Sequence, residues 1–331
     1  MSALELQAGE QDGWLDAAPA APRIAVLVPC YNEEVAIPRV VAAFRSALPE
    51  ATVYVYDNNS RDRTREAARA AGAVVRREQQ QGKGHVVRRM LADIEADVYV
   101  LVDGDDTYDA ADAPAMIGMM LADRLDMVTG VRVTDAAAAY RPGHRLGNRM
   151  LTGVVRVVFG DRITDMLSGY RVFSRRFAKS FPALAAGFET ETEFTVHALE
   201  LRMPVGEMRT RYRERPPGSH SKLSTYRDGF RILRSIGLLV RRERPLPFFA
   251  AVSVLLALLA FGLAVPVIQT WLETGLVPRL PTAVLSTGLI LLSCLSLACG
   301  LILDTVTRGR LEAKRMAYLG IPAPDFRLPP R

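Results

Sequence analysis

The chain has few of the residues that build disulfide frameworks or zinc sites. Its 331 residues include only three cysteines and four histidines. One cysteine follows the first apolar run and two lie in an apolar stretch near the C-terminus, so no disulfide or metal-ligand spacing is present. The histidines are scattered and form no cluster. These absences argue against a disulfide-stapled secreted scaffold and a histidine-based metal centre, and they suit a reducing cytosol.

Several sequence signatures are also missing. The one glycine-rich loop, QGKGH, lacks the spacing of a P-loop and of a dinucleotide-binding loop, which argues against an ATPase and a dehydrogenase. Residues 1–22 lack the basic-then-apolar order of a signal peptide, and we expect them to form a flexible tail. The chain shows no internal repeat and no Gly/Ser linker.

Charge is absent from two long segments near the C-terminus. No residue between Arg244 and Glu273 is charged, a run of 28 positions, and none between Arg279 and Asp304, a run of 24. An α-helix needs about 20 apolar residues to cross a bilayer core. A pair of buried core helices is the alternative, but such helices rarely run this long without a charge. The pattern therefore predicts a two-helix transmembrane hairpin over 245–306, followed by a tail over 307–331.

Basic residues flank this hairpin on its outer sides. The net charge is +6, and residues 202–244 alone hold 12 Lys or Arg against 4 Asp or Glu. Positive flanks favour the cytoplasmic side, so we expect both long ends to be cytoplasmic, at the inner (plasma) membrane. A basic segment beside a membrane attracts anionic lipid headgroups, and we expect no nucleic-acid partner. Residues 224–244 are predicted to form an amphipathic helix on the membrane surface, with an ordinary surface helix as the alternative.

Residues 23–223 show alternating strand and helix patterns. The expected strands are IAVLVP, TVYVYD, AVVRRE, DVYVLVD and DMVTGVRV, and the helices between the first four are VAIPRVVAAFRSAL, RTREAARAAG and KGHVVRRMLADIE. Apolar strands separated by helices predict an α/β domain with a mostly parallel, Rossmann-like sheet covered on both faces. Ligands bind such sheets at the carboxyl ends of the strands.

The stretch VLVDGDDTYD gives the clearest chemical signal. Asp103, Asp105 and Asp106 directly follow an apolar strand, and carboxylates this close repel one another unless a cation lies among them. Hard divalent cations take one or two carboxylates together with substrate phosphates. We therefore expect Asp103 and Asp105 to bind Mg²⁺ or Mn²⁺, with an acidic turn or helix cap as the alternative.

Three further loops should open onto the same edge of the sheet: VPCYNEE, YDNNSRDRT and QGKGHVVRRM. Together with the DGDD loop and DMLSGYRVFSRRF, these motifs resemble the family 2 glycosyltransferases of the polyprenyl-phosphate (dolichyl-phosphate mannose synthase-like) branch. The resemblance covers about 24–223 and implies a GT-A fold, and the two predicted spans suit the membrane-anchored bacterial members. DNNS stands where the family more commonly has DDGS, which leaves the identity of the base open.

The resemblance also implies roles for particular residues. Those expected to bind the nucleotide-sugar donor are Pro29, Tyr31, Glu33, Asp57, Lys83, Asp103 and Lys222. Those expected at the reaction centre or on the phosphates are Asp105, Arg132, Arg149, Ser168, Glu193 and Arg215. Arg145 is the alternative to Arg149, and Glu189 and Glu191 are the alternatives to Glu193. Within DMLSGYR, Asp165, Gly169 and Arg171 are expected to border the acceptor phosphate and the donor sugar with Ser168.

By resemblance, the reaction is an inverting transfer of a hexose from a UDP- or GDP-sugar to polyprenyl (undecaprenyl) phosphate, for cell-envelope glycan assembly or modification. A phosphate monoester has a second pKa of about 6, so this acceptor is largely a dianion at neutral pH and we expect no indispensable general base. Two alternatives stay open. One is a polysaccharide synthase, although QXXRW and further spans are missing, and the other is a non-catalytic nucleotide-sugar-binding scaffold. Assembly into a homo-oligomer is also left open.

Overall fold

The computed structural model describes residues 21–133, 153, 163–185, 187, 189–213 and 245–322. The chain divides into two compact units. The first contains the sheet, the helices that cover it and the residues from Ala317 onward, and the second contains the two long C-terminal helices up to Met316. The expected N-terminal tail over 1–20 and the expected amphipathic helix over 224–244 lie outside the described residues.

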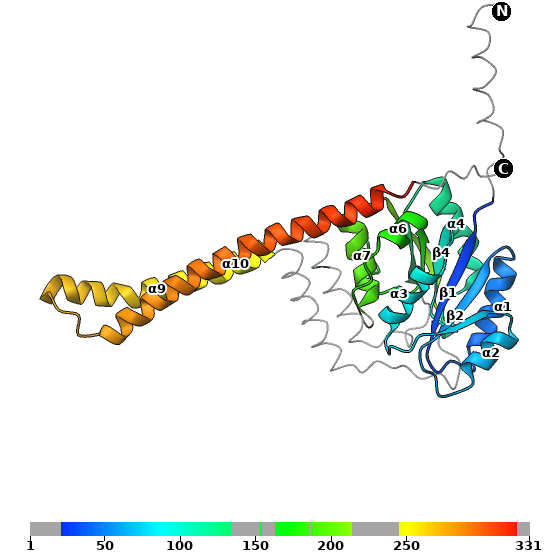
Figure 1. Cartoon of the computed structure of the whole chain (residues 1–331), viewed down its shortest axis with the longest axis horizontal. Helices are drawn as coiled ribbons and strands as arrows, with labels where there is room; N and C mark the ends of the chain where they lie inside the picture. The colour runs from blue at the N-terminus through cyan, green and yellow to red at the C-terminus, as the bar shows by residue number, and fades with distance from the viewer. Residues whose placement is uncertain are drawn as a thin grey trace, which may run out of the picture. The chain divides into compact units, whose positions relative to one another are not determined.

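A mixed sheet forms the centre of the first unit (Figure 1). It has seven strands in the order β3-β2-β1-β4-β6-β5-β7. The strands are β1 (Ile24–Cys30), β2 (Thr52–Asp57), β3 (Val74–Arg77), β4 (Val98–Leu101), β5 (Met127–Val133), β6 (Arg171–Ser174) and β7 (Val205–Arg211). Among these described strands only β6 runs antiparallel to its neighbours, β4 and β5. The other six therefore end at one common edge, which confirms the mostly parallel sheet.

Alternation along the central strands separates two cores, because successive side chains point to opposite faces of a sheet. Val26, Val28 and Val100 join one buried cluster with residues of α1 (Ile37–Ala47) and α4 (Ala113–Ala122). The intervening residues, such as Leu27 and Tyr99, are equally buried and face the other side. That side is covered by α3 (Lys83–Asp93), α6 (Arg175–Ser180) and α7 (Thr190–Glu200), opposite α1 and α2 (Thr64–Ala70) in Figure 1.

The sequence patterns did not identify β6 and β7. β6 comprises four residues, RVFS, all buried, so it is too short and too uniformly covered to show alternation. β7 pairs with β5 alone and lies at the edge of the sheet, where its polar residues stay partly exposed. Both strands depend on long-range pairing, which local patterns do not report.

The second unit is a hairpin of α9 (Pro245–Thr274) and α10 (Leu280–Leu319), both long and apolar enough to cross a membrane. Small or β-branched residues recur every seven positions along their contact, as in a coiled-coil seam: Ser253, Ala260 and Val267 on α9, and Ser286, Ser293 and Gly300 on α10. The Ser293 hydroxyl lies 2.9 Å from the Ser253 hydroxyl and 2.8 Å from the Ser253 carbonyl oxygen. Small residues let the two helix backbones approach closely in a membrane.

Helix α10 continues beyond the boundary expected near residue 306. It ends at Leu319, so the first part of the expected tail over 307–331 is helical. The stretch 307–319 is rich in Leu, Ala, Glu, Lys and Arg and contains no proline, which favours continuation of the helix into a polar region. Residues 323–331 lie outside the described residues.

Candidate functional site

The common edge of the sheet collects the predicted motifs. β1 and β2 end side by side, with Cys30 paired to Asp57, and β4 lies on the other side of β1. Asp103 follows β4 by two residues, and Lys83 begins α3 in the connection after β3. This is the edge at which parallel α/β sheets bind their ligands.

A buried lysine lies among the acids at this edge. The Lys83 ammonium is 2.5 Å from Asp103 Oδ1 and 2.5 Å from Glu191 Oε1, and its side chain is 10% exposed. Burial by itself would lower the pKa of Lys83, but the charges and hydrogen bonds of Asp103 and Glu191 outweigh burial and raise that pKa above its ordinary value. The ammonium therefore stays charged across the physiological pH range. It supplies part of the positive charge that the DGDD motif requires.

The two aspartates of the motif have different surroundings. The Asp103 side chain is 32% exposed, whereas Asp105 is buried. Asp105 Oδ1 accepts hydrogen bonds from the Thr107 hydroxyl at 2.7 Å and from the Thr107 backbone N–H at 3.3 Å. Gly169 lies directly against Asp103, because a Cβ at Gly169 would be 2.3 Å from Asp103 Oδ2. The Gly169 N–H donates to the Tyr108 hydroxyl at 2.9 Å, which joins the DGDD loop to the SGY segment.

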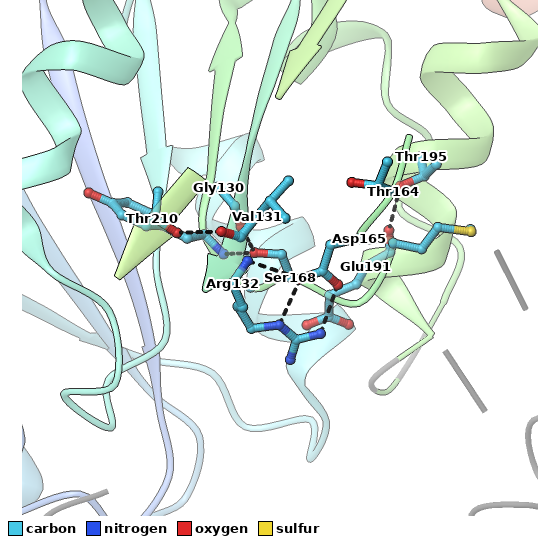
Figure 2. A network of polar contacts seen from close by, with 12 residues as sticks. Gly130, Val131, Arg132, Thr164, Asp165, Ser168, Glu191, Thr195 and Thr210 are labelled. Atoms are coloured by element: carbon cyan, nitrogen blue, oxygen red, sulfur yellow. Dashed lines mark hydrogen bonds and ion pairs between the residues drawn. The ribbon is translucent and has the colours of Figure 1, made fainter. Parts of the chain in front are cut away.

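Arg132, at the end of β5, is held by Asp165. Its Nε and one terminal nitrogen donate to Asp165 Oδ2 and Oδ1, both at 2.8 Å (Figure 2). Burial raises the pKa of the Asp165 carboxyl, but the hydrogen bonds and charge of Arg132 outweigh burial and lower it. The guanidinium also lies over the Tyr212 ring, 5.7 Å from its centroid. These contacts give Arg132 a fixed orientation at the edge of the sheet.

The DMLSGYR segment is held in place by hydrogen bonds of two of its own buried side chains, Ser168 and Arg171. Ser168 is fully buried, and its hydroxyl donates to the Gly130 carbonyl oxygen at 2.5 Å (Figure 2). Arg171 is also fully buried, and it donates to the backbone oxygens of Ser168 and Met166 and to the Thr195 hydroxyl. Burial lowers the pKa of Arg171 to about 10. Arg171 therefore supports the segment internally, whereas the resemblance led us to expect it beside the acceptor phosphate.

Helix α7 separates the three glutamates that the sequence left as alternatives. Glu191 is buried and contacts Lys83, and its Oε2 has no hydrogen-bond partner. Glu193, preferred from the sequence, accepts hydrogen bonds from the two backbone N–H groups of residues 184–185, at 2.8 and 2.9 Å. Glu189 is exposed. The structure thus brings Glu191 to the cluster and gives Glu193 a contact that holds a loop.

The residues expected around the nucleoside lie at the ends of β1 and β2, which hold Pro29 and Asp57, and on the loop after β1, which holds Tyr31 and Glu33. Asp57 is fully buried, and its Oδ1 accepts from the Ser60 backbone N–H at 3.3 Å. The backbone N–H of Glu33 donates to the Thr64 hydroxyl at 2.9 Å. Such cross-links hold the two loops together at the edge of the sheet.

Comparisons with known proteins agree with this geometry. Residues 25–181 match the family model described as Glycosyl transferase family 2. Glycosyltransferase AglJ of Haloferax volcanii is 33% identical to this chain over 308 residues, which cover 91% of this chain and 99% of that protein. The chain belongs to glycosyltransferase family 2.

This family 2 glycosyltransferase is also similar to two other known proteins. A dolichyl-phosphate hexose transferase of Haloferax volcanii is 28% identical over 221 residues, covering 67% of this chain and 95% of that protein. Glucosyl-3-phosphoglycerate synthase of Mycobacterium tuberculosis, crystallised with Mn²⁺, UDP-glucose and phosphoglyceric acid, superimposes with a TM-score of 0.55 at 23% identity. That match covers 65% of this chain and 80% of the synthase chain, and it confirms the expected GT-A fold.

The carboxylate oxygens at this edge of the sheet fit a divalent cation whose other ligands come from a substrate and from water. The described residues contain no group of three or more His, Cys, Asp or Glu side chains able to hold a metal by themselves. Mg²⁺ in nucleotide sites commonly takes one or two carboxylates and completes its shell with phosphate oxygens and water. Asp103 and Asp105 offer oxygen ligands of this kind, and the absence of a side chain at Gly169 leaves room for the Asp103 carboxylate.

Three predicted residues, Arg149, Arg215 and Lys222, lie outside the described residues, as does the alternative Arg145. The described segment 189–213 ends at Arg213. The Arg213 backbone N–H donates to the Thr107 carbonyl oxygen at 2.8 Å. The end of this described segment therefore lies beside the DGDD loop.

Sequence reasoning missed the part played by Asn58. This residue is 4% exposed, and its carboxamide contacts the QGKG loop that carries Lys83. The available signal was its position: it directly follows Asp57 at the carboxyl end of β2, where a side chain can turn toward the next loop.

Proposed function

We propose that this glycosyltransferase moves a hexose from a UDP- or GDP-linked donor to polyprenyl phosphate at a membrane, with inversion at the anomeric carbon. The observation that carries the proposal is the cluster of Lys83, Asp103 and Glu191 at the carboxyl edge of the sheet, in a chain with two helices apolar enough to cross a membrane. The relative named dolichyl-phosphate hexose transferase, matched over 95% of its length, supports a lipid-phosphate acceptor.

The charges of the site suit a diphosphate leaving group. Lys83 is buried and held protonated, and Arg132 is oriented by Asp165, so two fixed cations stand near the DGDD loop. A divalent ion, when bound with the donor, would be held by Asp103 and Asp105 and would supply further positive charge to the leaving group. Electrostatic stabilisation of this kind is commonly the largest single contribution to catalysis.

The remaining predicted residues keep their proposed places around the donor and the acceptor. Pro29, Tyr31, Glu33 and Asp57 would surround the nucleoside, and Ser168 would support the segment beside the transferred sugar. Arg149, Arg215 and Lys222 would contact phosphates. We propose Glu191 in the position by the reaction centre that the sequence assigned to Glu193, because Glu191 is the glutamate that reaches Lys83.

The acceptor explains why no general base is required. Its phosphate has a second pKa of about 6, so a nucleophilic oxygen is available at neutral pH without proton removal. The acids Asp103 and Glu191 are both paired with Lys83, which suits a role in positioning charge. The protein would then contribute alignment of the two phosphate-bearing substrates and exclusion of water.

The hairpin of α9 and α10 would anchor the enzyme beside its lipid acceptor. Residues 23–223 would form the catalytic domain and 224–244 a basic helix at the membrane surface, with both termini cytoplasmic. The basic flanks on both sides of the two apolar segments support this orientation.

The test uses the full chain in lipid nanodiscs with undecaprenyl phosphate, a panel of UDP- and GDP-sugars, and Mn²⁺ or Mg²⁺. We expect release of a nucleoside diphosphate that depends on the lipid and falls at least 100-fold with excess EDTA. Asp105→Asn should cause a similar loss, whereas Asp106→Asn, a matched change at a partly exposed neighbour paired with Arg39, should retain most activity.

Three results would count against the proposal, each in a different way. Full turnover with EDTA present would refute the metal role. Sugar transfer to a glycan hydroxyl and none to the lipid phosphate would favour a polysaccharide synthase. Donor binding with no turnover in any combination would favour the scaffold.

A further inference from the structure

The loop 78–82, between β3 and α3, depends on neighbouring side chains to satisfy its backbone. The Glu78 N–H donates to the Asp57 carbonyl oxygen at 2.9 Å, and the Gln80 N–H donates to the Glu78 side chain at 2.7 Å. The Gly82 carbonyl oxygen accepts from the first turn of α3, and the other described contacts of the loop backbone go to two adjacent asparagines that follow β2. Backbone groups without such partners are costly to bury, so the buried asparagine of the pair, Asn58, largely determines the shape of the loop.

Asn58 makes the central contacts. Its Nδ2 donates to the carbonyl oxygens of Gln80 at 2.7 Å and of Glu78 at 3.2 Å. Its Oδ1 accepts from the Gly82 backbone N–H at 2.7 Å. Its own backbone N–H donates to the Cys30 carbonyl oxygen at 2.8 Å, which fixes the residue to the end of β1. One buried residue thus links β1, through its backbone N–H, to the loop, through its carboxamide.

The Gly82 contact leads directly to Lys83. Gly82 has φ 135° and ψ 138°, a backbone conformation available to glycine, and it immediately precedes the first residue of α3, which is Lys83. The other side of this helical turn is also fixed, because a Cβ at Gly84 would lie 2.0 Å from the Ala185 carbonyl oxygen. The position of the Lys83 ammonium is therefore determined by the loop that Asn58 holds.

We propose that Asn58 is a positioning residue: it holds Lys83 against Asp103 and Glu191, and through Lys83 it sets the affinity of the site for the donor's diphosphate. The inference rests on the proposed function for its ligand. This role requires an amide at position 58, because the side chain donates two hydrogen bonds to carbonyl oxygens and an aspartate carboxylate has no proton to donate. Asn58→Asp would place a negative charge against two carbonyl oxygens and release the loop.

The experiment measures binding of UDP and of GDP, each with Mn²⁺, by titration calorimetry on the full chain in nanodiscs. Five proteins are compared: wild type, Asn58→Asp, Lys83→Met, the double variant, and Asn59→Asp as control. Asn59 is the adjacent asparagine and contacts the far part of the loop through the Gln79 carbonyl oxygen at 2.8 Å, in an exposed position. A thermal melt of each protein confirms that it is folded.

We expect Asn58→Asp to weaken binding of the nucleoside diphosphate at least 10-fold and Asn59→Asp to change it less than 3-fold. In the Lys83→Met background, Asn58→Asp should cause less than a 2-fold further loss, since its route of action has been removed. A purely structural role would not produce this non-additivity. If Asn58→Asp fails to fold, Asn58→Ala enters the same cycle, because it removes the side-chain hydrogen bonds without adding charge.

Two outcomes would overturn the inference while leaving the proposed function intact. One is wild-type affinity in both Asn58 variants, and the other is an equal loss from Asn58→Asp with and without Lys83. If the wild-type protein itself binds neither UDP nor GDP, the proposed donor class fails and the inference fails with it.

Discussion

Glutamine substitutions at Glu191 and Glu193 should affect different properties: Glu191→Gln should lower activity, and Glu193→Gln should lower stability. The two residues lie on the same turn of α7 and have the same chemistry. Glu191 contacts the buried ammonium of Lys83 at 2.5 Å, whereas Glu193 accepts two backbone N–H groups of residues 184–185. The pair therefore separates a role at the site from a role in holding a loop.

The magnitudes follow from these contacts. Glutamine keeps the shape of Glu191 but leaves the Lys83 ammonium bonded to a neutral acceptor in place of a carboxylate, a loss of about 1–1.5 kcal/mol. If that loss appears in the transition state, kcat/KM falls about 5- to 13-fold. In Glu193→Gln the amide nitrogen cannot accept a hydrogen bond, so one backbone N–H loses its partner. That change costs about 1 kcal/mol of stability, or about 2–4 °C in the melting temperature for a domain of this size.

The assay is lipid-dependent release of nucleoside diphosphate, measured beside a thermal melt of each variant. We expect Glu191→Gln to lose activity with little change in melting temperature, and Glu193→Gln to melt earlier with activity within about 3-fold of wild type. Equal losses of activity in the two variants would refute the assignment of Glu191 to the site. So would a Glu191→Gln enzyme with full activity.

Three further substitutions test other parts of the structure. Gly169→Ala would place a methyl group 2.3 Å from Asp103 Oδ2, so the Asp103 carboxylate must move. The affinity of the protein for Mn²⁺, measured by titration, should then fall at least 10-fold. Unchanged affinity would contradict the fit of this site to a metal. Arg132→Met leaves Asp165 buried without its cation, which should cost about 3 kcal/mol of unfolding free energy at pH 7. Because the folded protein lowers the pKa of Asp165, this contribution is present above about pH 4 and is lost below it. The difference in chemical-denaturation stability between wild type and variant should therefore shrink as the pH falls from about 4 toward about 2. A constant difference would count against the pairing. Ser293→Leu forces a large side chain into the seam between α9 and α10. The hairpin should melt at a lower temperature in detergent, while UDP binding by the catalytic unit stays unchanged. A melting temperature equal to that of wild type would show that the seam is not closely packed.

Much of the fold was predictable because the relevant signals are local. Apolar runs separated by helical patterns identified five of the strands and the helices between the first four, and the direction of parallel strands then placed the DGDD, VPCYNEE and QGKG loops at one edge. Two uncharged stretches sufficed to identify the helices of the hairpin. Each of these predictions uses residues that are neighbours in the chain or share a short period.

Long-range pairing limited the prediction of the sheet. β6 is a four-residue strand that enters the sheet antiparallel between β4 and β5, and nothing in RVFS indicates that direction. Arg171, at its first position, was expected to border the acceptor phosphate and the donor sugar because its segment resembles a family motif. Its burial beneath the segment is a consequence of the strand pairing.

The sequence alone determined that acids and a lysine would gather at the carboxyl edge of a parallel sheet, because strand order and loop position follow from local patterns. Only the tertiary structure decided which groups meet there. Lys83 and Glu191 are 108 residues apart, and the choice of Glu191 over its two neighbours depends on how α7 is rotated against α3. Such a choice is made by packing, because the rotation of α7 about its axis decides which of the three carboxylates faces Lys83.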